Sequence, residues 1–133
     1  MSMHVVRLKA AEADILIDRA AMDNMRQAVG DAVFDEIFED AVFEITDRLA
    51  QIETLARADN FDRIARVAHD LVAVAGTIGL TGVSDIAANL EFCCEDGDLI
   101  GAQAVASRLI RIGEDSLVAA AEISVAIVVE SAS

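Results

Sequence analysis

The apolar residues of this chain recur every three or four positions along most of its length, and no segment alternates polar and apolar residues for long. This spacing places apolar side chains on one face of an α-helix, whereas a half-buried strand would need alternation. Proline, which would interrupt a helix, is absent from the 133 residues. The pattern therefore predicts an all-α fold, a bundle of helices, and disfavours a fold built on a sheet.

Short polar or glycine-containing breaks divide the chain into five expected helices. The helices cover about residues 18–29, 31–56, 61–78, 83–94 and 99–129. Gly30 offers a left-handed stop after the first helix, and Asp31 is placed to cap the second. Asp59 or Asn60 can cap the third helix, and Thr81 can cap the fourth. Because the breaks are short, we expect consecutive helices to lie antiparallel.

Each expected helix carries one stripe of apolar residues that should face the core. In chain order the stripes are Ile17, Ala21, Met25 and Ala28; Phe34, Phe38, Ala41, Ile45, Leu49, Ile52 and Ala56; Ile64, Val67, Leu71, Val74 and Ile78; Val83, Ile86, Leu90 and Cys93 or Cys94; and Leu99, Ala102, Ala106, Leu109, Gly113, Leu117 and Ala120. The second helix also carries seven acids and no base between Asp31 and Asp47. We interpret this run as a solvated face.

The charge balance limits the classes of partner. The chain has 24 acidic residues against 10 Lys and Arg, a formal net charge of −14. This balance disfavours nucleic acid as a partner, because binding phosphates requires clustered basic residues. With 55% hydrophobic residues, the chain is too apolar for a disordered protein and long enough for one domain with a continuous core.

The sequence carries no recognisable targeting or membrane signal. Residues 1–9 lack the apolar stretch of a secretory signal, and no apolar run approaches the roughly 20 residues needed to cross a bilayer. Cys93 and Cys94 are adjacent, so on a helix they point about 100° apart and cannot easily bridge each other. We interpret them as buried small hydrophobic residues, and we expect a cytoplasmic protein without a membrane partner.

His69 lies in the middle of the third expected helix, two residues from both Val67 and Leu71 of the buried stripe. This offset turns its side chain about 200° away from the stripe, so His69 should face outward. Its neighbours on that face, mostly small or apolar, are Ala65, Arg66, Val72, Ala73 and Gly76. An exposed apolar surface of this kind indicates a binding site for another protein.

The sequence from His69 onward resembles that of the histidine-containing phosphotransfer (HPt) domain. Residues 69–80 read HDLVAVAGTIGL and are followed by Leu90-Glu91. The family places a histidine, small residues, a glycine and a later Leu-Glu or Leu-Gln in this order. The helix junction at 29–38 and the turn at 95–98 are also similar to those of the family, so the resemblance extends over about residues 14–120.

The resemblance implies an antiparallel four-helix bundle of HPt type with an additional N-terminal helical segment. We expect a single domain over residues 1–133, with the bundle core at 31–120, an N-terminal cover at 12–29 and a C-terminal helical tail at 117–130. The apolar end of the tail could pack within one chain or pair two copies. We favour packing within one chain and expect a monomer.

The resemblance also implies that His69 accepts a phosphoryl group from the aspartyl phosphate of one receiver domain and passes it to the aspartate of another. The expected partners are the receiver domains of a hybrid histidine kinase and of response regulators in two-component signal transduction. Such a protein is a phosphocarrier and has no ATP-dependent kinase activity of its own. We expect it to bind no cofactor and no metal, because the receiver supplies the Mg²⁺. A neutral imidazole suits this role, since its pKa of about 6.5 leaves a nucleophilic nitrogen near neutral pH.

Two positions depart from the His-x-Leu-Lys-Gly pattern of the family. Val72 stands where the family has the Lys that helps to hold the phosphoryl oxygens, and Ala73 stands where it has Gly. We expect Arg66, one turn before His69, or Arg63, about two turns before it, to supply the missing positive charge.

Glu91 occupies the position on the fourth expected helix where members of the family place a polar side chain near the histidine. A carboxylate at this position would orient the imidazole of His69 but would repel a phosphate. We expect Ala65 and Gly76 to contribute to the surface that a receiver contacts.

Three alternative functions stay open at this point. Val72 suggests an HPt fold that docks receivers or a kinase without being phosphorylated. A metalloenzyme in a helical bundle would need Glu-x-x-His pairs that project inward, whereas Arg66 precedes His69 by three residues and the histidine should face outward. A histidine kinase dimerisation domain would also expose a histidine, but 133 residues leave no room for an ATP-binding domain, and no Gly-rich phosphate loop is present.

Overall fold

The computed structural model describes residues 15–132 of the chain, and this part is helical apart from short connections. Its helices are α2 (Arg19–Val29), α3 (Asp31–Arg57), α4 (Phe61–Thr77), α5 (Thr81–Glu95) and α6 (Leu99–Ala132). The predicted all-α fold is confirmed, and the predicted helix bounds agree with the observed ones to within one turn.

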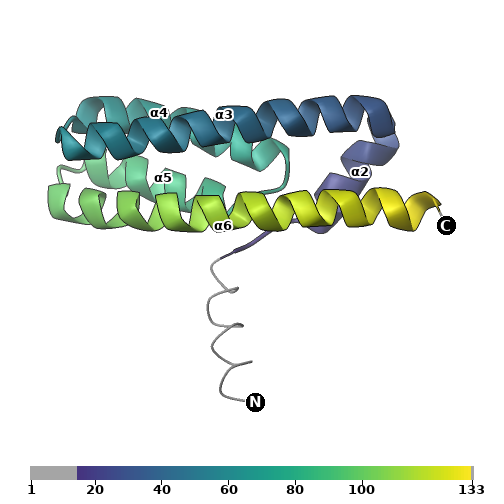
Figure 1. The fold of residues 1–133 in the computed structure, drawn as a ribbon. Coiled ribbons are helices and arrows are strands. Elements are labelled where there is room, and N and C mark those ends of the chain that lie inside the picture. Colours follow the sequence, from purple (N-terminus) through teal and green to yellow (C-terminus); the bar gives the residue numbers. More distant parts are fainter. Residues whose placement is uncertain (1–14, 133) are drawn as a thin grey trace, which may run out of the picture.

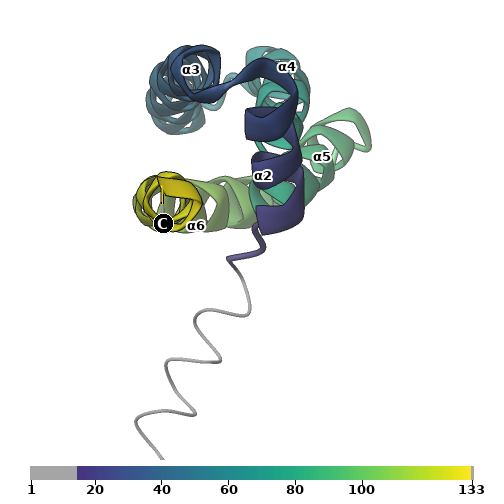
Figure 2. The same ribbon diagram turned by 90° about the vertical axis from the view of Figure 1, so that its right-hand side faces the viewer.

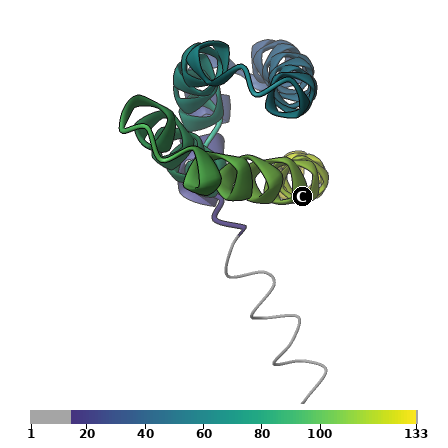
Figure 3. The same ribbon diagram turned by 90° about the vertical axis from the view of Figure 1, so that its left-hand side faces the viewer.

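Helices α3, α4, α5 and α6 form an antiparallel four-helix bundle, in which each helix packs against the next and α6 closes the ring against α3. The α4–α5 hairpin is shorter than α3 and α6 and lies beside only part of their length (Figure 1). Helix α2 occupies the space beyond the hairpin, between the start of α3 and the end of α6 (Figures 1 and 2). The turns α3–α4 and α5–α6 lie together at the opposite end (Figure 3). The predicted bundle with an additional N-terminal helix is thus confirmed.

The bundle core is built largely from the stripes that the sequence predicts. The buried apolar residues of α3, α4 and α5 include Phe34, Phe38, Ala41, Ile45, Leu49, Ile52, Ile64, Val67, Leu71, Val83, Ile86, Leu90 and Cys93, and those of α6 include Ala102, Ala106, Leu109, Ile112, Ala120 and Ile127. All seven acids between Asp31 and Asp47 are exposed, so the predicted solvated face is confirmed. The core therefore sets which face of α4 is turned outward.

Two of the predicted stripes are partly wrong. On α2 the fully buried residue is Met22, which is 1% exposed, whereas Ala28 is exposed. Helix α2 runs across the bundle axis instead of along it, so only part of it reaches the core (Figure 2). On α6, Leu99 is 46% exposed because it stands in the first turn, before the helix enters the core at Ala102.

Two of the predicted caps are also wrong. Asp31 is the first residue of α3, and Gly30 precedes it as the cap with a φ of +86°. Thr81 is the first residue of α5, and its hydroxyl donates to the Leu16 carbonyl at 3.1 Å. Because α5 begins at Thr81 itself, Leu80 takes the N-cap position and no side chain caps this helix. The side chain of Asn60 caps α4 as predicted.

The segment before α2 holds the turn between α4 and α5 in place. The Asp18 N–H donates to the Gly79 carbonyl at 2.7 Å, and the Gly82 N–H donates to the Leu16 carbonyl at 2.9 Å. A methyl group at Gly79, whose φ is +84°, would lie 2.8 Å from the Asp18 carbonyl oxygen. Only glycine fits this turn without a shift of the backbone. These contacts fix the hairpin whose first helix carries His69.

The C-terminal tail continues α6 as far as Ala132. Ile127 is 3% exposed, so the inward face of the tail packs within the chain, while Val125 on the outward face is 65% exposed. Cys93 and Cys94 are free thiols, the first buried and the second half-buried, and burial raises the pKa of Cys94. The start of the predicted N-terminal cover, residues 12–14, lies outside the described residues.

Candidate functional site

His69 projects from the middle of α4, and 72% of its side chain is exposed. The helix beneath it is anchored in the core, because Ala68 and Leu71 are 0% exposed. The outward orientation expected from its offset to the buried stripe is thus observed. A packed helix presents the imidazole to solvent on a rigid support.

Glu91 of α5 holds the imidazole of His69 from one side. Its Oε2 lies 3.0 Å from Nδ1 of His69, and its Oε1 lies 3.3 Å from the same nitrogen. The side chain of Glu91 is 26% exposed, so the carboxylate is partly shielded from water. A proton on Nδ1 can therefore be donated to Glu91, which leaves the lone pair of Nε2 on the free edge of the ring. The structure brings these two predicted site residues together.

A second contact joins α4 and α5 along the same face. The Ser84 hydroxyl of α5 donates to the backbone carbonyl of Val72 at 2.9 Å. A methyl group added to the exposed Gly76 would meet only Ser84 Oγ, at an ordinary contact distance of 3.7 Å. The packing of the chain itself thus leaves room for a methyl group at position 76. Sequence reasoning missed Ser84, because a hydrogen bond to the backbone of a neighbouring helix leaves no spacing pattern.

Arg66 and Arg63 lie on α4 before His69, and both are exposed. Within residues 15–132 neither forms an ion pair. Arg66 is one helical turn from His69, a spacing at which side chains on a helix surface are neighbours. Arg63 lies a further turn away, and its backbone N–H is used by the cap of α4. Of the two guanidinium groups, that of Arg66 is better placed to reach a group on His69.

The remaining predicted residues of this face are small or apolar. Val72 is half-buried and packs against the core, so the place where the HPt pattern has Lys is occupied by an apolar side chain. Ala65 is half-buried, while Ala73 is exposed. The predicted residues on this part of the α4 surface are therefore small or apolar apart from Arg66 and Arg63.

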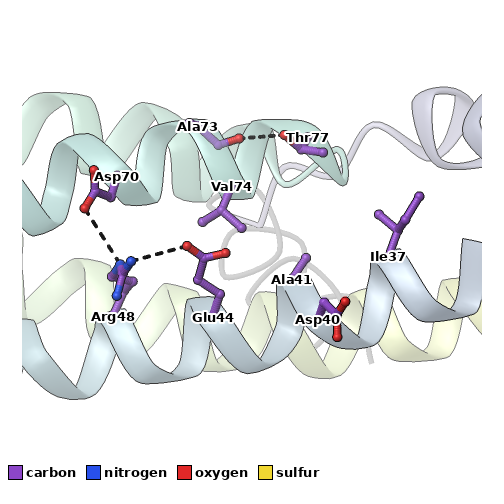
Figure 4. A pocket seen from close by; sticks show the side chains of 9 residues that line it. All are labelled: Ile37, Asp40, Ala41, Glu44, Arg48, Asp70, Ala73, Val74 and Thr77. Atoms are coloured by element: carbon purple, nitrogen blue, oxygen red, sulfur yellow. Dashed lines mark hydrogen bonds and ion pairs between the residues drawn. The ribbon is translucent and has the colours of Figure 1, made fainter.

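A groove between α3 and α4 borders this face (Figure 4). We call it the α3–α4 groove; it has a volume of about 600 Å³ and is lined by Ile37, Asp40, Ala41, Glu44, Arg48, Asp70, Ala73, Val74 and Thr77. Ala73, four residues after His69 and therefore its neighbour on the helix surface, belongs to the lining, so the groove lies next to the histidine on α4. The sequence does not predict this groove, because its walls come from two helices whose relative register is set by the core.

Arg48 spans the α3–α4 groove from α3 (Figure 4). Its Nη2 lies 3.3 Å from Glu44, its Nη1 lies 3.6 Å from Asp47, and its Nε lies 4.0 Å from Asp70 of α4. The Nε is buried and has no hydrogen-bond partner within the described residues. A weak signal for this residue exists in the sequence, since Arg48 is the first base after the seven acids of α3.

Between residues 15 and 132, no three His, Cys, Asp or Glu side chains gather closely enough to hold a metal ion. In the same range, every helix is too short or too polar to serve as a membrane span.

Comparisons with known proteins agree with the observed fold. The Hpt domain family matches residues 36–120. The crystal structure of histidine-containing phosphotransfer protein B from Pseudomonas aeruginosa PAO1 has a similar fold, with a TM-score of 0.74 at 15% identity over 81% of this chain and 93% of that one. A rice protein proposed to be a histidine-containing phosphotransfer protein gives a TM-score of 0.62 at 16% identity, over 95% of this chain and 94% of that one. No sequence among the curated proteins matches the chain.

Proposed function

Because this chain belongs to the Hpt domain family, which has a phosphotransfer role in phosphorelays, we propose that it is a phosphorelay intermediate phosphorylated on His69. In this proposal His69 accepts the phosphoryl group from the aspartyl phosphate of one receiver domain and passes it to the aspartate of another. The observation that carries the proposal is the exposed imidazole whose Nδ1 is bound to Glu91, while Nε2 has no hydrogen-bond partner within residues 15–132.

The chemistry of the step follows from this geometry. Nε2 of His69 attacks the phosphorus, the N–P bond forms, and the P–O bond to the receiver aspartate breaks, so that the aspartate leaves as a carboxylate. The imidazole becomes more positive as the N–P bond forms. Glu91 stabilises that charge through Nδ1, where the proton stays. Glu91 therefore acts on the ring nitrogen that does not react.

The phosphoryl oxygens need positive charge that His69 and Glu91 do not provide. We propose that Arg66 supplies part of it from this chain and that the receiver supplies Mg²⁺. Because Glu91 binds Nδ1, its carboxylate acts on the opposite edge of the ring from the phosphoryl group on Nε2. This placement reduces the repulsion between carboxylate and phosphate that the sequence alone suggests.

Transfer from phosphorylated receivers tests the proposal. The chain is incubated with a panel of receivers carrying labelled phosphate, and the expected product is an acid-labile, base-stable label on the wild-type chain. His69→Gln should carry no label, while His4→Gln should be labelled like the wild type. A label that persists in His69→Gln, or its absence from the wild type with every receiver, would contradict the proposal.

A second candidate function rests on Val72. An apolar, half-buried side chain stands at this position in place of the Lys that the HPt pattern has beside the histidine. The chain would then dock receivers without accepting phosphate. This reading predicts that wild type and His69→Gln bind a receiver equally well while neither becomes labelled.

A further inference from the structure

We propose that the acidic side chains of the α3–α4 groove select receivers whose docking element carries Lys or Arg next to an apolar residue. The inference rests on the proposed function, because it names the kind of partner that the surface beside His69 fits. It goes beyond that function by assigning a role to residues of α3, a helix that carries none of the residues predicted for the site.

The shape and lining of the groove suit an apolar side chain with a cation beside it. Ala41 is buried, and Ile37 and Val74 are half-buried. Together these three residues form the apolar surface between the two helices. Ala73 adds no bulk on the α4 side. Amphipathic segments commonly bind in apolar grooves of this kind between helices.

The charges of the groove leave a negative excess. The lining contains three carboxylates, those of Asp40, Glu44 and Asp70, and one guanidinium, that of Arg48. Arg48 is already engaged by Glu44 and Asp70. Asp40 is exposed and forms no ion pair within residues 15–132. A basic side chain of a partner would therefore find an unmatched carboxylate at the groove.

The groove and the arginines of α4 give the docking surface an uneven charge. Asp70 follows His69 on the groove side, whereas Arg66 and Arg63 precede it along α4. A receiver that covers His69 meets acids toward α3 and bases toward the start of α4. Complementary charges of this kind steer association and suppress wrong partners more than they add affinity.

The test compares two charge reversals on the same helix. Asp40→Lys changes the groove, while Asp35→Lys changes an exposed aspartate about 140° away around α3. Asp35 likewise has no ion pair within the described part of the chain. The receiver that phosphorylates the wild type fastest is chosen for the binding measurement. The Kd between this receiver, in its unphosphorylated form, and each variant is measured by titration at about 0.05 M and 0.5 M salt.

We expect Asp40→Lys to raise the Kd by about tenfold at low salt and Asp35→Lys by less than about twofold. The difference should shrink at high salt, because screening weakens the interaction. Equal effects of the two variants, or none, would overturn the proposal while leaving phosphorylation of His69 intact. A wild-type dimer that dissociates on Asp40→Lys would also overturn it, by assigning the groove to a second copy. If no receiver of the panel binds the wild type or phosphorylates it, that result contradicts the proposed function itself.

Discussion

The outer faces of α3 and α4 are both exposed, yet they are built in different ways. On α3, away from the α3–α4 groove, the carboxylates of Asp35 and Glu39 form no ion pair within residues 15–132. On α4 the exposed His69 is bound by Glu91 of the next helix. The comparison teaches that exposure alone does not identify a functional side chain in this bundle. A functional side chain is identified more reliably by a contact from a neighbouring helix that orients it.

The contact between Glu91 and His69 is what distinguishes the outer face of α4 from that of α3. Removing this contact should have the largest effect on the rate of phosphotransfer. We expect Glu91→Ala to slow phosphotransfer to His69 by about tenfold to hundredfold, because the imidazole loses both its orientation and its charge partner. Glu91→Gln, whose amide oxygen can still accept from Nδ1, should retain more activity than Glu91→Ala. Single-turnover rates with a phosphorylated receiver measure both. Glu39→Gln on α3 is the control, and equal rates in all variants would remove Glu91 from the account.

A substitution at Gly76 tests whether docking of a receiver needs a small residue on the outer face of α4. We expect Gly76→Leu to slow transfer by about tenfold, because its side chain would obstruct a docked receiver. The variant should not lose thermal stability, since position 76 is exposed, a Cβ there meets only Ser84 Oγ at 3.7 Å, and leucine favours helices over glycine by up to about 1 kcal/mol. Ala50→Leu, at an exposed position of α3, should transfer at the wild-type rate. A fully active Gly76→Leu would show that receivers do not approach this part of α4.

Arg66 should have a smaller effect, because the receiver provides most of the positive charge. We expect Arg66→Ala to slow transfer and to change the lifetime of the phosphohistidine by about fivefold, and Arg66→Lys to recover part of both. Arg63→Ala is the matched change one turn further along α4. If Arg66→Ala leaves rate and lifetime untouched, its guanidinium does not contact the phosphoryl group.

The acids of α3 away from the groove should have the smallest effect. We expect the double variant Asp35→Asn/Glu39→Gln to transfer at a rate within about twofold of the wild type, because exposed charges contribute little to stability or to a distant site. Transfer rates at two salt concentrations check this expectation. A large loss would mean that the outer face of α3 also contacts receivers.

The helices could be predicted closely from the sequence, because the three-and-four spacing of apolar residues directly reports a buried helix face. The prediction failed where tertiary packing decides. Met22 replaces Ala28 as the buried contact of α2, since that helix crosses the bundle. Thr81 does not cap α5, since it is the first residue of that helix and Leu80 takes the N-cap position.

The candidate site could be predicted in part. The outward direction of His69 follows from its offset to Val67 and Leu71, and Glu91 was singled out only through the resemblance to the HPt family. The contact of Arg48 with Asp70 across the α3–α4 groove could not be predicted. It depends on the register between two helices, which the local spacing of residues does not encode.

The most direct test of the central claim identifies the nitrogen that carries the phosphoryl group. The chain, labelled with ¹⁵N in its histidines, is phosphorylated by a receiver and examined by NMR, which distinguishes the two ring nitrogens of His69 from each other and from those of His4. We predict one phosphohistidine, at Nε2 of His69, with the proton on Nδ1. Phosphate at Nδ1 of His69, or on His4, would contradict the account.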